Sequence, residues 1–152
     1  MAWLPDDFVH PERVELSAGH HLRPIRADDV DIDYPAVMGS RQRLWALYGE
    51  AWGWPPATMT LEQDGEDLAH HEAEIAAHET FNYAVLDEDE TALYGCVYID
   101  PPDARSPFGS DAMVSWWVVD AAVGSALETA LAAFVPEWLE REWGFRAVHW
   151  FP

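Results

Sequence analysis

The chain contains no lysine, only one cysteine and no long apolar run. Its eight basic residues, all arginine, stand against 28 aspartates and glutamates, so the 152 residues carry a net charge of −20. Because Cys96 is alone, an intramolecular disulfide and a cysteine-rich zinc site are both excluded. No run of about 18 apolar residues is present, so we expect no transmembrane helix. Residues 1–7 lack the basic and apolar regions of a secretory signal, and we therefore expect a cytoplasmic protein.

The acidic excess narrows the partners that we expect. A surface of this charge repels phosphate backbones, which argues against a nucleic-acid partner, and we expect no membrane partner either. The same charge attracts cations, so the small-molecule partner that it favours is a cationic amine. The alternative interpretation is that the acidity serves only solubility, and that arginine without lysine reflects a GC-rich genome.

The hydrophobic pattern predicts one α/β domain. The chain is 49% hydrophobic and 13% aromatic, and its length fits a single core. We expect an irregular N-terminal arm over residues 1–19 and one folded domain over residues 20–152. Alternating apolar and polar residues predict strands at 21–26, 81–86, 92–99, 112–119 and 147–151. Helical spacing predicts one or two short helices within residues 31–52, and further helices at 61–79 and 125–143. Since Pro24 lacks a backbone donor, its strand should lie at a sheet edge or begin there.

Three segments carry a resemblance to a known family. Residues 22–29 (LRPIRADD) look like an opening strand and turn, residues 94–99 (YGCVYI) look like a third strand, and residues 116–131 look like a coenzyme A-binding strand, loop and helix. In this order they resemble the GNAT superfamily of acyl-CoA-dependent N-acetyltransferases. The resemblance implies an α/β (α+β) fold with a mixed, mostly antiparallel central sheet and helices on both faces.

The resemblance also implies an activity. It is acyl transfer, with acetyl-CoA or another acyl-CoA as co-substrate, to a primary amine by direct attack and without a metal. The family continues past the last strand with a helix that often brings a tyrosine, whereas this sequence ends at Pro152, so the resemblance is to a divergent, C-terminally truncated member. The alternative is a catalytically inactive GNAT-like domain that binds a ligand or a partner.

The expected coenzyme A site follows from the third segment. A glycine-containing turn between a strand and a helix exposes backbone N–H groups, which together with the helix dipole bind a diphosphate. The usual family loop reads Q/R-x-x-G-x-G/A, and here Ala121 stands at the Gln or Arg position. By resemblance, the strand residues bind the pantetheine arm and the loop residues bind the diphosphate: Trp117, Val118 and Val119, followed by Val123, Gly124, Ser125 and Ala126.

Direct acyl transfer needs a base for the ammonium group and a proton donor for the leaving thiolate. By their positions in the predicted sheet, the candidate catalytic residues are Glu79, Asp100 and His149 as bases, with Tyr98 or Tyr94 as the acid. The aromatic cluster before Pro55 is a candidate wall for a cationic acceptor, through cation–π contact. This cluster consists of Trp45, Tyr48, Trp52 and Trp54, and the alternative is a small apolar core beneath a loop.

Three further features have a functional and a structural interpretation. His71, Glu74 and His78 share one face of the predicted helix 61–79, which suits zinc or simply a solvated acidic surface. Cys96 in mid-strand is a small buried hydrophobe rather than a nucleophile. The apolar terminal strand 147–151 would be an aggregation-prone edge, so we expect it to pair with another chain, as in a homodimer, or to be covered by residues 3–14.

Overall fold

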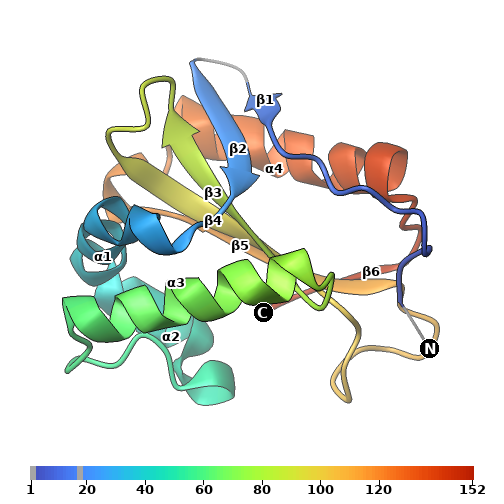
Figure 1. Ribbon diagram of the computed structural model, residues 1–152, viewed down its shortest axis with the longest axis horizontal. Coiled ribbons are helices and arrows are strands. Elements are labelled where there is room, and N and C mark those ends of the chain that lie inside the picture. Colours follow the sequence, from blue (N-terminus) through green and yellow to red (C-terminus); the bar gives the residue numbers. More distant parts are fainter. Residues whose placement is uncertain (1–2, 17–18) are drawn as a thin grey trace.

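The computed structural model describes residues 3–16 and 19–152, and these form one mixed α/β domain (Figure 1). The strands are β1 (Val14–Leu16), β2 (His20–Pro24), β3 (Phe81–Asp87), β4 (Leu93–Asp100), β5 (Ala112–Val118) and β6 (Val148–Trp150). The longer helices are α1 (Val30–Gly39), α2 (Arg41–Trp52), α3 (Leu61–Ala76) and α4 (Ala126–Trp138). Short helical turns are η1 (Ala27–Asp29), η2 (Asp120–Ala122) and η3 (Leu139–Trp143).

The six strands form one sheet in the order β1-β2-β3-β4-β5-β6. All neighbours are antiparallel except β5 and β6, which run parallel and pair only over Ala112–Val114 of β5. The remainder of β5 therefore keeps one open side. Strands β4 and β5 approach so closely at Gly95 that an added Cβ would lie 2.1 Å from the Trp117 carbonyl oxygen, which explains glycine at this position.

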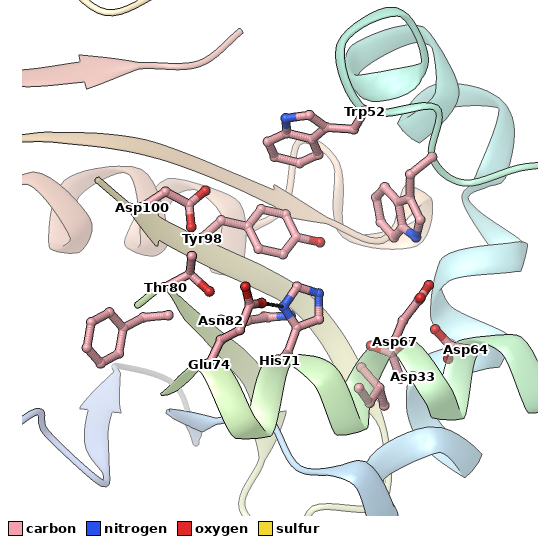
Figure 2. A pocket seen from close by; sticks show the side chains of 13 residues that line it. Asp33, Trp52, Asp64, Asp67, His71, Glu74, Thr80, Asn82, Tyr98 and Asp100 are labelled. Carbon is pink, nitrogen blue, oxygen red and sulfur yellow. Dashed lines mark ion pairs between the residues drawn. The ribbon is translucent and has the colours of Figure 1, made fainter. Parts of the chain in front are cut away.

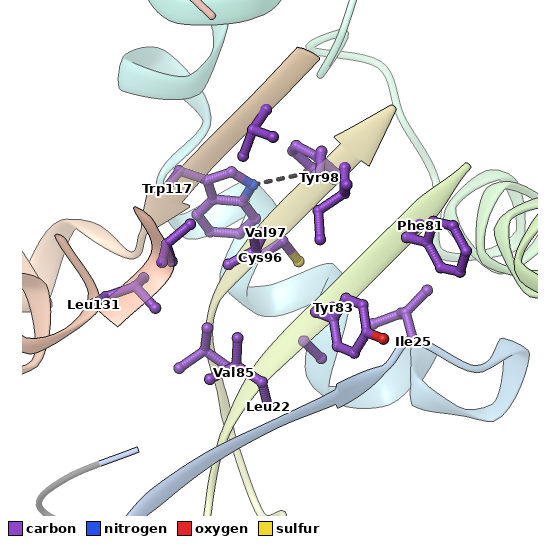
Figure 3. Close-up of a cluster of buried hydrophobic side chains, with 14 of the residues drawn as sticks. Leu22, Ile25, Phe81, Tyr83, Val85, Cys96, Val97, Tyr98, Trp117 and Leu131 are labelled. Carbon is purple, nitrogen blue, oxygen red and sulfur yellow. Dashed lines mark hydrogen bonds between the residues drawn. The ribbon is translucent and has the colours of Figure 1, made fainter. Parts of the chain in front are cut away.

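Helices cover both faces of the sheet, as the resemblance implied (Figure 1). Helix α4 packs on one face, where Trp138 meets Tyr83 edge to face at 5.0 Å between ring centroids. Helices α1, α2 and α3 lie on the other face, where the Tyr48 hydroxyl of α2 and the Ser115 hydroxyl of β5 are 2.6 Å apart. Figure 3 shows the buried side chains along the central strands, among them Trp117, which is 2% exposed. The predicted mixed, mostly antiparallel sheet is confirmed.

Several helix boundaries follow from local start and stop signals. Thr60 and Gln63 form a reciprocal capping box at the start of α3, with each side chain bonded to the other residue's backbone N–H. Gly144 adopts φ +72° after η3, as a helix-ending glycine does. Helix α4 gives way to a π-helical segment just after Pro136, because a proline inside a helix lacks the backbone N–H and crowds the preceding turn.

Three local expectations are wrong. Residues 14–16, expected in an irregular arm, form β1 and pair with β2, so β2 is not an edge strand. Pro24 is nevertheless tolerated because it is the last residue of β2 and lies beyond the reach of β1. Helix α3 ends at Ala76 rather than residue 79, because His78 adopts φ +57°.

The N-terminal arm packs on the α3 end of the molecule rather than along β6. The Trp3 indole N–H donates to the His78 carbonyl at 3.0 Å, and Phe8 contacts Trp143 at 4.9 Å between ring centroids. Strand β6 pairs with β5 alone in the described chain. The expected cover by the arm is therefore wrong, and pairing of β6 with another chain stays a prediction. Within residues 3–16 and 19–152, no helix has the length and apolarity needed to cross a membrane.

Candidate active site

A cavity of about 350 Å³ lies between α3, the end of α2 and strands β3 and β4. Figure 2 shows acidic side chains at both of its ends and aromatic rings along one wall. The lining residues that carry chemistry are Asp33, Asp64, Asp67, His71, Glu74, Thr80, Asn82, Tyr98 and Asp100. Trp52, Trp54, Leu68 and Phe81 complete the lining.

Helix α3 supplies the acidic side of the cavity through its period. Asp64, Asp67, His71 and Glu74 follow at intervals of three, four and three residues, which places them on one helical face. Burial lowers the pKa of His71, with Glu74 and Asp67 opposing that effect, so its imidazole is largely neutral at pH 7. The cavity therefore gains no compensating positive charge from this histidine.

Asp100 ends β4 at one end of the cavity (Figure 2). Burial, with a smaller contribution from the charges of Glu74 and Asp103, raises the pKa of its carboxyl to about 7. A carboxylate that titrates near neutrality is suited to accept a proton at physiological pH. Of the sequence candidates for a base, Asp100 is the one that lines this cavity.

Tyr98, two residues earlier on β4, points its hydroxyl into the same cavity (Figure 2). The Trp117 indole N–H donates to that hydroxyl at 2.8 Å, so the Tyr98 proton is free for another acceptor. Burial raises the pKa of Tyr98 well above its usual value, which keeps the phenol protonated. Tyr98 and Asp100 thus form an acid and a base on the same strand face.

The other sequence candidates lie elsewhere. Glu79 is exposed after α3, beside the N-terminal arm, and does not line the cavity. The His149 ring nitrogen Nδ1 lies 3.1 Å from the Ser106 hydroxyl, also outside the cavity. Tyr94 packs on His20 with ring centroids 4.8 Å apart, at the opposite end of β4.

The aromatic cluster divides between wall and core. Trp52 and Trp54 line the cavity. Tyr48 is fully buried beneath them and stacks on Trp52 at 4.5 Å, and burial raises its pKa to about 12. Trp45 is 41% exposed and lies under the Arg41 guanidinium on the outer surface of α2. Both interpretations of the cluster therefore apply, each to different residues.

The structure does not place His71, Glu74 and His78 on one helical face, as a zinc site would require. Because α3 ends before His78, the His78 imidazole turns toward the arm and lies 3.0 Å from the His10 ring nitrogen. Over the described residues, no three histidine, cysteine, aspartate or glutamate side chains lie close enough to hold a metal ion.

The open side of β5 is where the resemblance places the pantetheine arm of the acyl-CoA. The Val119 N–H donates to the Tyr94 carbonyl of β4 at 2.9 Å, whereas the Val114 carbonyl accepts from Phe151 on the β6 side. Since backbone direction alternates along a strand, the backbone groups of Trp117 and Val119 face β4, while those of Trp116 and Val118 face the open side. No local sequence pattern indicates Arg43 of α2, which donates to the Val118 carbonyl and pairs with Asp120 at 2.7 Å.

In the glycine turn before α4, the Glu128 carboxylate accepts the hydrogen bond from the Gly124 N–H. Gly124 has φ +78°, and its N–H donates to Glu128 Oε1 at 2.9 Å. Ser125 is the helix N-cap, and its hydroxyl accepts from the Glu128 N–H at 3.4 Å. The glutamate carboxylate here satisfies a donor that the resemblance assigns to a diphosphate, and it adds negative charge where a diphosphate must approach.

We expect Glu128→Gln to increase coenzyme A affinity roughly threefold to tenfold, because one like charge near the diphosphate is removed. Calorimetric titration with coenzyme A measures the change. Glu137→Gln, on the same helix but pairing with Arg141 at 3.2 Å, removes the same charge farther along α4. Equal affinities of the two variants would show that the Gly124–Glu128 contact has no part in coenzyme A binding.

Comparison with known proteins agrees with this architecture. No family model and no curated protein sequence matches the chain. Among solved structures, the ribosomal-protein-S5-alanine acetyltransferase from Vibrio fischeri aligns with a TM-score of 0.68 and 15% identity, over 90% of this chain and 71% of that chain. RimL, a ribosomal L7/L12 α-N-protein acetyltransferase in complex with coenzyme A, gives 0.66 and 14% over 86% and 69%. The microcin C7 self immunity acetyltransferase MccE, in complex with acetyl-CoA and AMP, gives 0.64 and 11% over 88% and 69%.

Proposed function

Starting from the GNAT acetyltransferase fold, which these structural similarities establish for the chain, we propose that the protein transfers an acyl group from an acyl-CoA to a primary, cationic amine. The observation that carries the proposal is the pair Asp100 and Tyr98, which share the acidic cavity: burial raises the pKa of the Asp100 carboxyl to about 7, and it raises the pKa of the Tyr98 phenol, which stays protonated. Thiol release from acetyl-CoA over a panel of amines tests it.

The chemistry assigned to the chain is proton transfer and positioning. The Asp100 carboxylate accepts a proton from the bound ammonium group, which leaves a neutral amine with a free lone pair. The acyl-CoA supplies a thioester carbonyl as the electrophile. The Tyr98 hydroxyl donates its proton to the departing sulfur and recovers one from the acylated nitrogen. The proton held by Asp100 then passes to solvent, so one proton is released for each acyl group transferred. Trp52 and Trp54 hold the cationic amine at the wall.

The backbone features suit an acyl-CoA, although the Glu128 side chain competes with it for one of these groups. Trp116 offers backbone groups on the open side of β5, where the Val118 carbonyl already accepts from Arg43. The N-terminus of helix α4 offers the Ala126 N–H, whereas the Ser125 N–H donates to the Ala122 carbonyl and the Gly124 N–H donates to Glu128. Glu128 must release Gly124 before a diphosphate can bind there. Arg43, which already contacts Val118, is positioned to supply the positive charge that Ala121 does not.

The Gly124–Glu128 contact favours a second candidate function. A turn satisfied by its own carboxylate is consistent with a catalytically inactive GNAT-like domain that binds a ligand in the acidic cavity. Calorimetric titration with coenzyme A separates the two proposals. An acyltransferase should bind coenzyme A, whereas an inactive domain should not bind it, either as the wild type or as the Glu128→Gln variant.

Salt should affect the two substrates in opposite directions. With a net charge of −20, the protein attracts a cationic amine over a range that shrinks to about 8 Å at physiological ionic strength. We expect the Michaelis constant of the amine to rise several-fold with added salt, while that of the anionic acyl-CoA falls. Steady-state kinetics over a salt series measures both. An amine Michaelis constant that ignores salt, or a preference for neutral or anionic amines, would reduce the acidity to a solubility feature.

A further inference from the structure

The geometry points to an acceptor with two cationic groups: an elongated diamine whose reacting amino group lies near Asp100 and Glu74 while its second ammonium group binds Asp33, Asp64 and Asp67. This inference rests on the proposed function, because it treats the cavity as the acceptor pocket. It adds a second subsite, at the end of the cavity away from Asp100.

The two acidic ends are separated along α3. Figure 2 shows Asp33, Asp64 and Asp67 together at one end and Asp100 at the other. Asp67 and Glu74 are seven residues apart on the helix, which corresponds to about 10 Å along its axis. Asp64 and Glu74 are about 15 Å apart by the same rise. A single small ammonium group cannot reach both ends.

Unpartnered polar atoms point to a ligand in this cavity. Asp64 is 2% exposed and its Oδ2 has no hydrogen-bond partner among the described residues. Asn82 is 4% exposed, and its Oδ1 is likewise unpartnered within residues 3–16 and 19–152. Both residues line the cavity, and both free atoms are acceptors, so the missing partner is a donor.

The charges around the second subsite identify that donor as a cation. Asp33 is 3% exposed, and its carboxyl lies beside that of Asp64 inside the fold. Burial and the nearby carboxyls of Asp64, Asp29 and Asp67 raise the pKa of Asp33, and burial and Asp67 raise that of Asp64. None of the described residues that line the cavity is an arginine. An ammonium group supplies both the hydrogen-bond donors and the charge that this end lacks.

The test is a calorimetric titration of the full chain, without acyl-CoA, using straight-chain α,ω-diamines from diaminoethane to diaminodecane. Monoamines of equal chain length control for apolar contact. We expect a diamine to bind about tenfold tighter than its matched monoamine once its two ammonium groups are about 10 Å apart, and to lose that advantage at shorter lengths.

Two variants locate the second subsite. Asp64→Asn removes the buried carboxylate, and Asp67→Asn removes the exposed one, so the second variant keeps the test open if the first does not fold. Each is expected to weaken long diamines about tenfold and to leave monoamines unchanged. Asp31→Asn, exposed on α1 and outside the cavity, removes the same charge and should change neither.

Equal binding of diamines and matched monoamines at every length would overturn the inference. So would equal effects of Asp67→Asn and Asp31→Asn. Thiol release from acetyl-CoA distinguishes a failure of the proposed acyl transfer from a failure of the proposed diamine subsite. Length-dependent diamine binding without thiol release contradicts acyl transfer and supports the two-ended subsite. Thiol release with no diamine preference contradicts the subsite alone.

Discussion

Asp100→Asn is expected to lower kcat/KM for the amine by about 10²- to 10⁴-fold, since it removes the proposed general base. The wild-type value should rise with pH through about 7 and then level off, because Asp100 acts as the carboxylate and its pKa is raised to about 7 by burial and by Glu74 and Asp103. Stopped or continuous thiol-release assays across the pH range measure both effects.

Thermal unfolding shows whether a loss of activity in Asp100→Asn comes from loss of the base or from loss of the fold. The pKa of Asp100 is higher in the fold than the usual value near 3.9, so its ionised form opposes folding above that pH. Asp100→Asn should therefore be at least as stable as the wild type at pH 8, by thermal unfolding. Glu79→Gln, a change outside the cavity, is expected to retain activity. Comparable losses in the two variants would remove Asp100 from its proposed role.

Gly124→Val is expected to abolish coenzyme A binding measured by calorimetry. Gly124 has φ +78°, which a β-branched residue adopts only at a cost of roughly 1–2 kcal/mol, so the turn should rearrange and redirect its N–H groups. Apart from its chain neighbours, no atom of residues 3–16 and 19–152 lies within 4 Å of a Cβ built at Gly124, so the expected effect is conformational and not a clash.

Gly144→Val is the matched control. Gly144 has φ +72°, has the same open space around its Cβ, and follows η3 at the far end of the α4 segment. We expect a similar loss of stability and unchanged coenzyme A affinity. If Gly124→Val bound coenzyme A as tightly as the wild type, the diphosphate site would have to lie elsewhere.

The candidate site divides into parts that the sequence could indicate and parts that it could not. Asp100 and Tyr98 were candidates because both lie near the end of a strand, where side-chain direction follows a simple alternation. The acidic face of α3 is visible as a helical spacing. Its meeting with Asp33 of α1 and Asn82 of β3 depends on tertiary packing, which no local pattern contains.

The errors have a similar origin. His78 was grouped with His71 by helical spacing, and a single residue at φ +57° moved its ring toward His10 instead. The turn at Gly124 was recognised from its glycine, but the contact with Glu128 needs a rotamer that spacing alone does not specify. Arg43 reaches Val118 from a different helix, 75 positions away in the chain.

Thiol release from acetyl-CoA in the presence of a long straight-chain diamine is the most direct test of acyl transfer to a cationic amine with Asp100 as the base. We expect release that depends on both substrates, forms one acylated amine per thiol, and falls at least about a hundredfold in Asp100→Asn. The proposed acyl transfer would be contradicted if the wild-type protein, under conditions where the diamine binds, released no thiol in response to any cationic amine.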